Sequence, residues 1–351
     1  MPRSAAPRPA SAALALKPPF SLLLAGLGAL LAAGLVLAAG LGYIAIPARE
    51  VLAIILARLG HGVAGDAVTR AVVLDVRLPR ILTAALVGGN LAVAGVIFQA
   101  ILLNPLADPY TLGVSSGAAF GASLALLANL AWLGGLSVPL AAFAGALLAV
   151  LAVLGLAGGD RSYAGNSLIL AGVIVAAILS AGIGLVKYLA DEQVSVIIFW
   201  LMGSFAARTW ADVGLVLAAG LLTLGLGLYH GRDLNVMALG ERGAASLGLD
   251  TARLRKRLLI VASLGTAVSV SVSGIIGFVG LIVPHLLRLL IGPDNRKLIP
   301  AAGLMGAILL LLADTISRAM LSREVPVGVL TALIGGPFFC LIFKKKLGRG
   351  A

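Results

Sequence analysis

Long runs without a charged residue constrain this sequence more than any other feature. An apolar helix of about 20 residues crosses the ~30 Å hydrocarbon core of a bilayer. The runs free of Asp, Glu, Lys and Arg are 18–48, 81–107, 109–159, 162–186, 213–230, 258–287, 298–313 and 325–343. With 60% hydrophobic and only 11% charged residues, the chain lacks the polar surface of a water-soluble protein. The sequence therefore predicts an integral membrane protein.

Two of these runs are too long for a single crossing. Glycine and proline interrupt helices, and they occur near the middle of 109–159 and in the second half of 258–287. Each long run therefore predicts two helices joined by a turn, which brings the total to about ten. The runs lack the alternating polarity of barrel strands. The predicted fold class is an all-α polytopic membrane protein.

One predicted helix carries a stripe of small residues. Gly113, Gly117 and Gly121 stand four residues apart and so share a helix face. Small residues at this spacing allow two helix backbones to approach closely in lipid. We expect this face to pack against another helix.

The basic residues predict the orientation in the membrane. If the N-terminus is inside, the cytoplasmic side receives the basic clusters at 253–257, 296–297 and 344–349, as the positive-inside rule favours. The net charge of +12 then reflects loops facing anionic lipid, with no nucleic-acid partner. We expect a flexible cytoplasmic tail at 1–19, a transmembrane domain at 20–343 and a basic cytoplasmic tail at 344–351.

The sequence contains no recognisable catalytic or metal-binding motif. G-x-x-x-x-G-K-[ST], H-E-x-x-H and C-x-x-C are all absent, and His61, His230 and His285 are far apart in sequence. His285, in V-P-H-L-L-R, is expected to pack against its neighbours and not to bind a metal. We therefore expect no catalytic residue, metal site or cofactor in this chain.

An ion-coupled secondary transporter is the main alternative function at this stage. Such carriers keep ionisable groups at mid-membrane, and Asp108 and Asp314 are the candidates here. Asp314 stands four residues before Arg318, a spacing that favours a structural ion pair over a proton relay. A membrane anchor for a signalling complex is a more distant alternative.

Several motifs together are specific to one family. They are R-L-P-R (77–80), N-P-L-A-D-P (104–109), L-G-V-S-S-G-A (112–118), G-I-I-G-F-V-G-L-I-V-P-H-L-L-R (274–288), A-D-T-I-S-R (313–318) and E-V-P-V-G-V-L-T-A-L-I-G-G-P-F-F (324–339). They resemble the permease subunits of FecCD-type ABC importers, from about residue 77 to residue 343. The resemblance implies a ten-helix type II importer permease in a bacterial inner membrane. It also implies a homodimer, two cytoplasmic ATPase subunits that use ATP and Mg, and an external substrate-binding protein.

The resemblance implies a cytoplasmic gate. It maps onto Asn104 and Leu106 in the N-P-L turn and onto Gly165 and Asn166, where the family more usually has small hydroxyl residues. From the residues alone, Asn104 is equally expected to cap the turn before Pro105.

Residues 234–250 form an amphipathic segment on the predicted cytoplasmic side. The segment could rest on anionic lipid as an interfacial helix. The resemblance instead implies a coupling helix that docks into the ATPase. The residues at the matching positions are Leu239, Gly240, Ala245, Leu247 and Gly248.

On the outer side, the resemblance implies docking of the binding protein through arginines. Arg77, Arg80 and Arg318 match family arginines that hold glutamates of that partner, and Arg323 is a weaker match. The alternative is that these side chains extend along the helix ends to lipid phosphates. Family cargoes are ferric siderophores, haem and cobalamin. We expect an iron chelate, although no residue here selects among them.

Overall fold

The computed structural model describes residues 19–42, 44–61, 64–130, 133–158, 165–319 and 324–347, and all regular structure within them is helical. The α-helices are α1 (Phe20–Gly40), α2 (Ala48–Leu56), α3 (Ala67–Ala71), α4 (Leu78–Ile101), α5 (Val114–Leu127), α6 (Ser137–Ala157), α7 (Gly165–Leu189), α8 (Val194–Leu201), α9 (Trp210–Tyr229), α10 (Gly231–Met237), α11 (Gly240–Ser246), α12 (Thr251–Ser273), α13 (Val279–Ile291), α14 (Asn295–Ala319) and α15 (Val327–Leu347). Short helical turns are η1 (Ala57–His61), η2 (Val72–Arg77), η3 (Gly134–Leu136) and η4 (Asp191–Gln193). Arg323 and almost all of the predicted N-terminal tail lie outside the described residues.

The described helices confirm the predicted number of spans. Seven helical stretches are long and apolar enough to cross a membrane: 20–40, 67–101, 134–157, 165–189, 210–229, 251–273 and 295–319. Three shorter apolar helices, α5, α13 and the described part of α15, bring the seven to ten. The chain breaks between α5 and α6 and between α12 and α13, as the two over-long runs predict. The helix of α15 continues to Leu347, beyond the predicted domain boundary at residue 343, because lysine and leucine are good helix formers.

The break between α12 and α13 lies inside the protein and not at its surface. Gly274 ends α12 with φ +70°, and an added Cβ would overlap the carbonyl of Trp200, so both the conformation and the contact require glycine. The Tyr110 hydroxyl donates to the Ile276 carbonyl at 2.9 Å and accepts from its N–H at 3.3 Å. These bonds satisfy backbone groups that have no helical partner at membrane depth.

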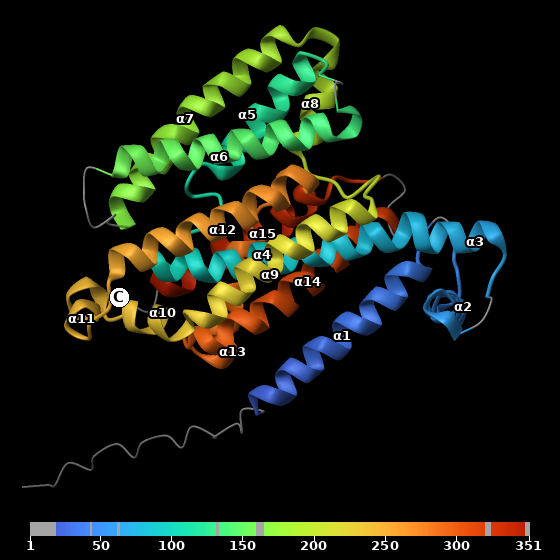
Figure 1. Cartoon of the computed structure of the whole chain (residues 1–351), viewed down its shortest axis with the longest axis horizontal. Helices are drawn as coiled ribbons and strands as arrows, with labels where there is room; N and C mark the ends of the chain where they lie inside the picture. The colour runs from blue at the N-terminus through green and yellow to red at the C-terminus, as the bar shows by residue number, and fades with distance from the viewer. Residues whose placement is uncertain are drawn as a thin grey trace, which may run out of the picture.

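Helix α4 is the centre of the bundle, and α9, α12, α13 and α14 pack around it. Figure 1 shows α5 to α8 grouped on one side of this bundle and α1 on the opposite side. Close contacts between glycines hold the helices together: a Cβ on Gly95 would overlap the Gly280 backbone. Two residues of the predicted stripe behave in the same way, with Gly117 against Gly145 and Gly121 against the Ala141 carbonyl. Gly113 does not share their helix face, because it precedes α5 with φ +74° and lies against α7.

Candidate functional site

The predicted site residues separate to two ends of the molecule. Figure 1 shows α2 and α3 at one end and α10 and α11 at the other. The predicted docking arginines lie at the first end, which we call the α2–α3 end. The predicted gate and coupling residues lie at the second, the α10–α11 end.

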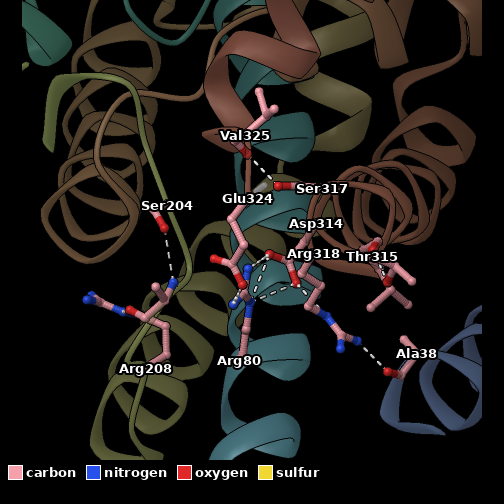
Figure 2. Close-up of polar contacts among 12 residues, drawn as sticks. Ala38, Arg80, Ser204, Arg208, Asp314, Thr315, Ser317, Arg318, Glu324 and Val325 are labelled. Atoms are coloured by element: carbon pink, nitrogen blue, oxygen red, sulfur yellow. Dashed lines mark hydrogen bonds and ion pairs between the residues drawn. The ribbon is translucent and has the colours of Figure 1, made fainter. Parts of the chain in front are cut away.

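Two of the three predicted docking arginines, Arg80 and Arg318, meet around one buried carboxylate, Asp314. Arg80 donates to Asp314 through Nε at 3.0 Å and Nη2 at 2.9 Å, and Arg318 Nε lies 3.5 Å from the same carboxylate (Figure 2). The pair of Asp314 and Arg318 is therefore the structural ion pair that their spacing predicts. Arg80 also donates to Glu324 at 3.0 Å, and the Glu324 side chain is 54% exposed. Glu324 is thus the accessible acid of the cluster.

Arg77 and Arg318 both bind the C-terminal end of α1. Arg77 Nη1 donates to the carbonyls of Ala39 at 2.8 Å and Gly40 at 3.0 Å, and Arg318 donates to the carbonyl of Leu41. The last carbonyls of a helix lack partners within it, and a cation is favoured there. Arg77 is buried, so the alternative of a side chain extended to lipid phosphates does not fit it. Both arginines hold α1 in place.

Arg208 is a further arginine at the α2–α3 end, and Figure 2 shows it in the same region as Arg80. Its guanidinium donates to the carbonyls of Ala206 at 3.0 Å and Val272. It therefore ties the loop before α9 to the end of α12. No sequence motif singled out Arg208. The capping box that follows it, Thr209 with Asp212, was the available sign of a fixed helix start.

The predicted gate residues lie close together at the other end. Asn104 Oδ1 accepts the N–H of Leu106 at 2.9 Å, so Asn104 does cap the turn around Pro105. The Leu106 side chain is exposed. Gly165 packs against the end of α4, where an added Cβ would lie 2.7 Å from the Leu102 carbonyl oxygen. The turn and the start of α7, where Asn166 is also exposed, are thus neighbours.

The predicted coupling helix is two short helices, α10 and α11, and not one. Gly240 has φ +83° and breaks the helix between them. Leu234 and Ala244 are buried against the transmembrane helices. Leu239 and Leu247 are each 65% exposed, and Ala245 and Gly248 lie on the same exposed side of the segment. The segment therefore presents a small apolar surface away from the membrane bundle.

Hydrogen bonds anchor α10 to the start of α14. Asn235 donates to Asp294 at 2.7 Å and accepts the N–H of Asn295 at 2.8 Å. Burial acts to raise the pKa of Asp294, but the bonds from Asn235 and from the backbone N–H of Arg296 outweigh it and hold the pKa below its ordinary value. The base of the coupling segment is therefore fixed to a membrane helix.

Arg255 connects α11 to the end of α4. Its Nη1 donates to Glu241 of α11 at 2.9 Å, and its Nε donates to the carbonyl of Ile101 at 2.9 Å. Sequence reasoning grouped Arg255 with the exposed basic cluster 253–257, but its side chain is fully buried. Ile101 is the last residue of α4, directly before the gate turn. These contacts thus join α11 to the end of α4, next to the predicted gate turn.

Comparison with known proteins agrees with this architecture. The sequence matches the FecCD transport family over residues 30–345, which begins well before residue 77, where the recognisable motifs start. It is 42% identical over 272 residues to the cobalamin import system permease protein BtuC of Halobacterium salinarum, which covers 77% of this chain and 73% of that protein.

Two further matches cover almost the whole chain. One is the molybdate import system permease protein MolB of Haemophilus influenzae, at 38% identity over 329 residues, 93% of this chain and 96% of that protein. The other is a solved structure reported as an inward-facing conformation of a metal-chelate type ABC transporter, with a TM-score of 0.81, 34% identity and coverage of 93% and 99% of the two chains. With ten apolar helices among the described residues, this chain belongs to the FecCD transport family and is a multi-pass ABC importer permease.

Proposed function

We propose that this chain is the membrane subunit of a binding-protein-dependent importer for an iron chelate, either a ferric siderophore or haem, with cobalamin less favoured. The similar metal-chelate transporter supports a chelated metal as cargo. The observation that carries the ABC mechanism is the contact path from α11 through Glu241 and Arg255 to the gate turn. An importer driven from the cytoplasm requires such a path.

The energy source in this proposal is a separate ATPase subunit that binds ATP and Mg. The exposed leucines Leu239 and Leu247, with Gly240, Ala245 and Gly248, form the surface on which it docks. When two ATPase subunits close, α11 moves and displaces Ile101 through Arg255. The displacement opens the turn at Asn104 and Leu106 away from Gly165 and Asn166.

The buried acid of the bundle argues against ion coupling. Asp314 is buried, and Arg80 and Arg318 supply its counter-charge. A proton relay needs a carboxylate that can exchange its proton during the cycle. Both arginines instead hold Asp314 in a structural ion pair, and Asp108 accepts the N–H of Tyr110 at 2.8 Å in the turn before α5.

An apolar cavity of about 570 Å³ lies beside the break between α12 and α13, and we assign it to the cargo pathway. Its walls include Leu201, Ile275, Phe278, Val329 and Leu333. A wall with few polar groups releases a bulky chelate readily. In the proposal a second copy of the chain supplies the other wall, and an external binding protein delivers the cargo at the α2–α3 end.

The α2–α3 end faces outward in this arrangement, and both termini lie in the cytoplasm of a bacterial inner membrane. Arg80, with Arg77 and Arg318 behind it, receives carboxylates of the binding protein. Arginine suits this role because its fork pairs with both oxygens of a carboxylate.

Reconstitution into vesicles tests the proposal. Uptake of a ferric chelate should require the binding protein, the ATPase subunit and ATP on the side of α10 and α11. Uptake driven by an ion gradient without the ATPase would overturn it. Competition among a ferric siderophore, haem and cobalamin then identifies the cargo.

A further inference from the structure

A second apolar cavity, of about 410 Å³, lies between α1, α4, α9 and α14. Its walls include Leu35, Leu86, Val93, Leu221 and Leu304. Asn90 is the only lining residue with a polar side chain, and its amide is turned toward α12, where it donates to the Gly265 carbonyl at 2.7 Å. The cavity therefore offers no polar group to water or to a polar cargo.

This cavity lies beside α9 and α1. Figure 1 shows α1 on the opposite side of the bundle from α5 to α8. The α9 side chains Leu217 and Leu221, which line the cavity, are exposed. Water does not fill an apolar space of this size. If the space were empty, the atoms of its walls would lose their dispersion contacts on that side. Hydrocarbon from the surrounding lipid is the material that fits.

A further cavity of about 480 Å³, mostly apolar but with Arg58 and Asp75 in its lining, lies nearer the α2–α3 end. It is lined by Leu78, one helical turn before Leu82 of the apolar cavity, and by Trp210, three residues before Val213. The two cavities thus follow the facing sides of α4 and α9. We call the two neighbouring cavities together the α4–α9 slot; its polar top is the end with Arg58 and Asp75, and its bottom is the apolar cavity.

The polar top carries both signs of charge. Arg58 and Asp75 line it, both are exposed, and they form no ion pair with each other in the part of the chain that the structure describes. A guanidinium binds a phosphate through two parallel hydrogen bonds, and a carboxylate accepts hydrogen bonds from an ammonium. Tryptophan is favoured where lipid headgroups meet hydrocarbon, and the Trp210 indole is held there by a 3.1 Å bond to the Leu74 carbonyl.

We propose that the α4–α9 slot binds one phospholipid with a phosphoethanolamine headgroup, with the phosphate at Arg58, the ammonium at Asp75 and an acyl chain in the apolar cavity. Opposite charges side by side select a zwitterionic headgroup over an anionic one, because Asp75 repels a second negative charge. The site requires only that the chain spans a bilayer. It is therefore independent of the cargo and of the ATPase.

Lipid retention tests the apolar half. Gly220 lines the cavity, and the nearest atom to an added Cβ is the Asn90 Cβ at 3.9 Å, so the ring of Gly220→Phe would enter the cavity without a clash. Gly225→Phe is the matched control. Gly225 lies on the same helix but outside the cavity lining, and no atom lies within 4 Å of a Cβ added there.

The readout is native mass spectrometry of the permease released from membranes of mixed phospholipids into mild detergent. The unmodified chain and Gly225→Phe should each retain a phosphatidylethanolamine, and Gly220→Phe should lose it. Equal retention by the unmodified chain and Gly220→Phe would overturn the proposal.

Fluorescence tests the headgroup half and does not depend on Gly220→Phe folding. Trp132→Phe and Trp200→Phe leave Trp210 as the only tryptophan of the chain. Acyl-brominated phosphatidylethanolamine should quench Trp210 at about tenfold lower mole fraction than brominated phosphatidylglycerol, the equivalent of about one charge-assisted hydrogen bond. Arg58→Gln with Asp75→Asn should remove the preference. Identical curves for the two lipids, or a preference for the anionic one, would contradict the assignment.

Discussion

Arg255 of α12 and Glu241 of α11 form an ion pair at 2.9 Å in which the arginine is 1% and the glutamate 44% exposed. The pair therefore crosses from the surface segment into the protein interior. Because the same arginine also holds the Ile101 carbonyl, a displacement of α11 cannot leave the end of α4 unchanged. In the proposed mechanism, Arg255 is a positioning residue between the coupling surface and the gate.

The first prediction concerns this pair in the reconstituted transporter. Glu241→Gln and Arg255→Met should each lower the amount of cargo moved per ATP hydrolysed, with ATPase binding retained. The double variant should be no worse than Arg255→Met, because residues that act through one contact are not additive. Asp250→Asn and Arg253→Met, from an exposed pair at 3.3 Å, are the controls. A fall in thermal stability with an unchanged transport-to-ATP ratio would reduce Arg255 to a structural residue.

The second prediction concerns the buried carboxylate. Asp314→Ala leaves Arg80 and Arg318 without their shared counter-charge, so we expect a loss of about 3–5 kcal/mol of stability, typical of breaking a buried pair. Glu324→Gln, at the exposed side of the cluster, should cost at most about 1 kcal/mol. Thermal unfolding in detergent measures both. Similar midpoints for the two variants would mean that the buried pair is not a stabilising element.

The third prediction concerns docking of the binding protein. Glu324 forms an ion pair with Arg80 in the free permease and so competes with carboxylates of the partner. Glu324→Gln should therefore strengthen docking, whereas Arg80→Glu should weaken it. A Glu→Arg change on the partner should restore part of the binding to Arg80→Glu. The dissociation constant and its dependence on salt are the measurements. Arg77→Glu is unsuitable for this test, because it would set a carboxylate against the carbonyls of α1. A dissociation constant unaffected by Arg80→Glu would place docking elsewhere.

The fourth prediction concerns the close contact of α4 with α13. Gly95→Ala would bring a methyl group against the Gly280 backbone, and overpacking of this kind costs about 1–3 kcal/mol. Gly225→Ala, which meets no neighbour, should be neutral or stabilising because alanine favours helix. The two variants are compared by thermal unfolding. Equal stability would show that the helices can separate at this point without cost.

The fifth prediction concerns the gate. Leu106 is exposed, so Leu106→Ala should leave stability unchanged and increase leak of trapped substrate without ATP. Leu215→Ala, an exposed leucine of α9, is the control. Efflux from loaded vesicles is the measurement. If both variants leak at the rate of the unmodified chain, Leu106 does not close the pathway.

Hydropathy predicted the spans because burial in lipid is decided locally, over about 20 residues at a time. The spacing of Asp314 and Arg318 also predicted their ion pair, while the docking and gate roles stay predictions. The burial of Arg77 and Arg255 was missed for a physical reason. Their partners are backbone carbonyls, at Ala39 and Ile101, and a carbonyl is present at every residue. A residue pattern therefore carries no sign of which carbonyl an arginine will bind.

The arginines that bind the end of α1 are synthesised later than α1 itself, which affects when this helix gains its hydrogen bonds. Arg318 lies 277 residues after Leu41, whose carbonyl it binds. When α1 first enters the membrane, this end of the helix has no such donor, and Arg318 arrives only with the ninth of the ten spans. The N-terminal helix α1 therefore gains its last hydrogen bonds late in biogenesis. A chain truncated before α14 would lack the donor to the Leu41 carbonyl and would keep only the bonds from Arg77 to Ala39 and Gly40.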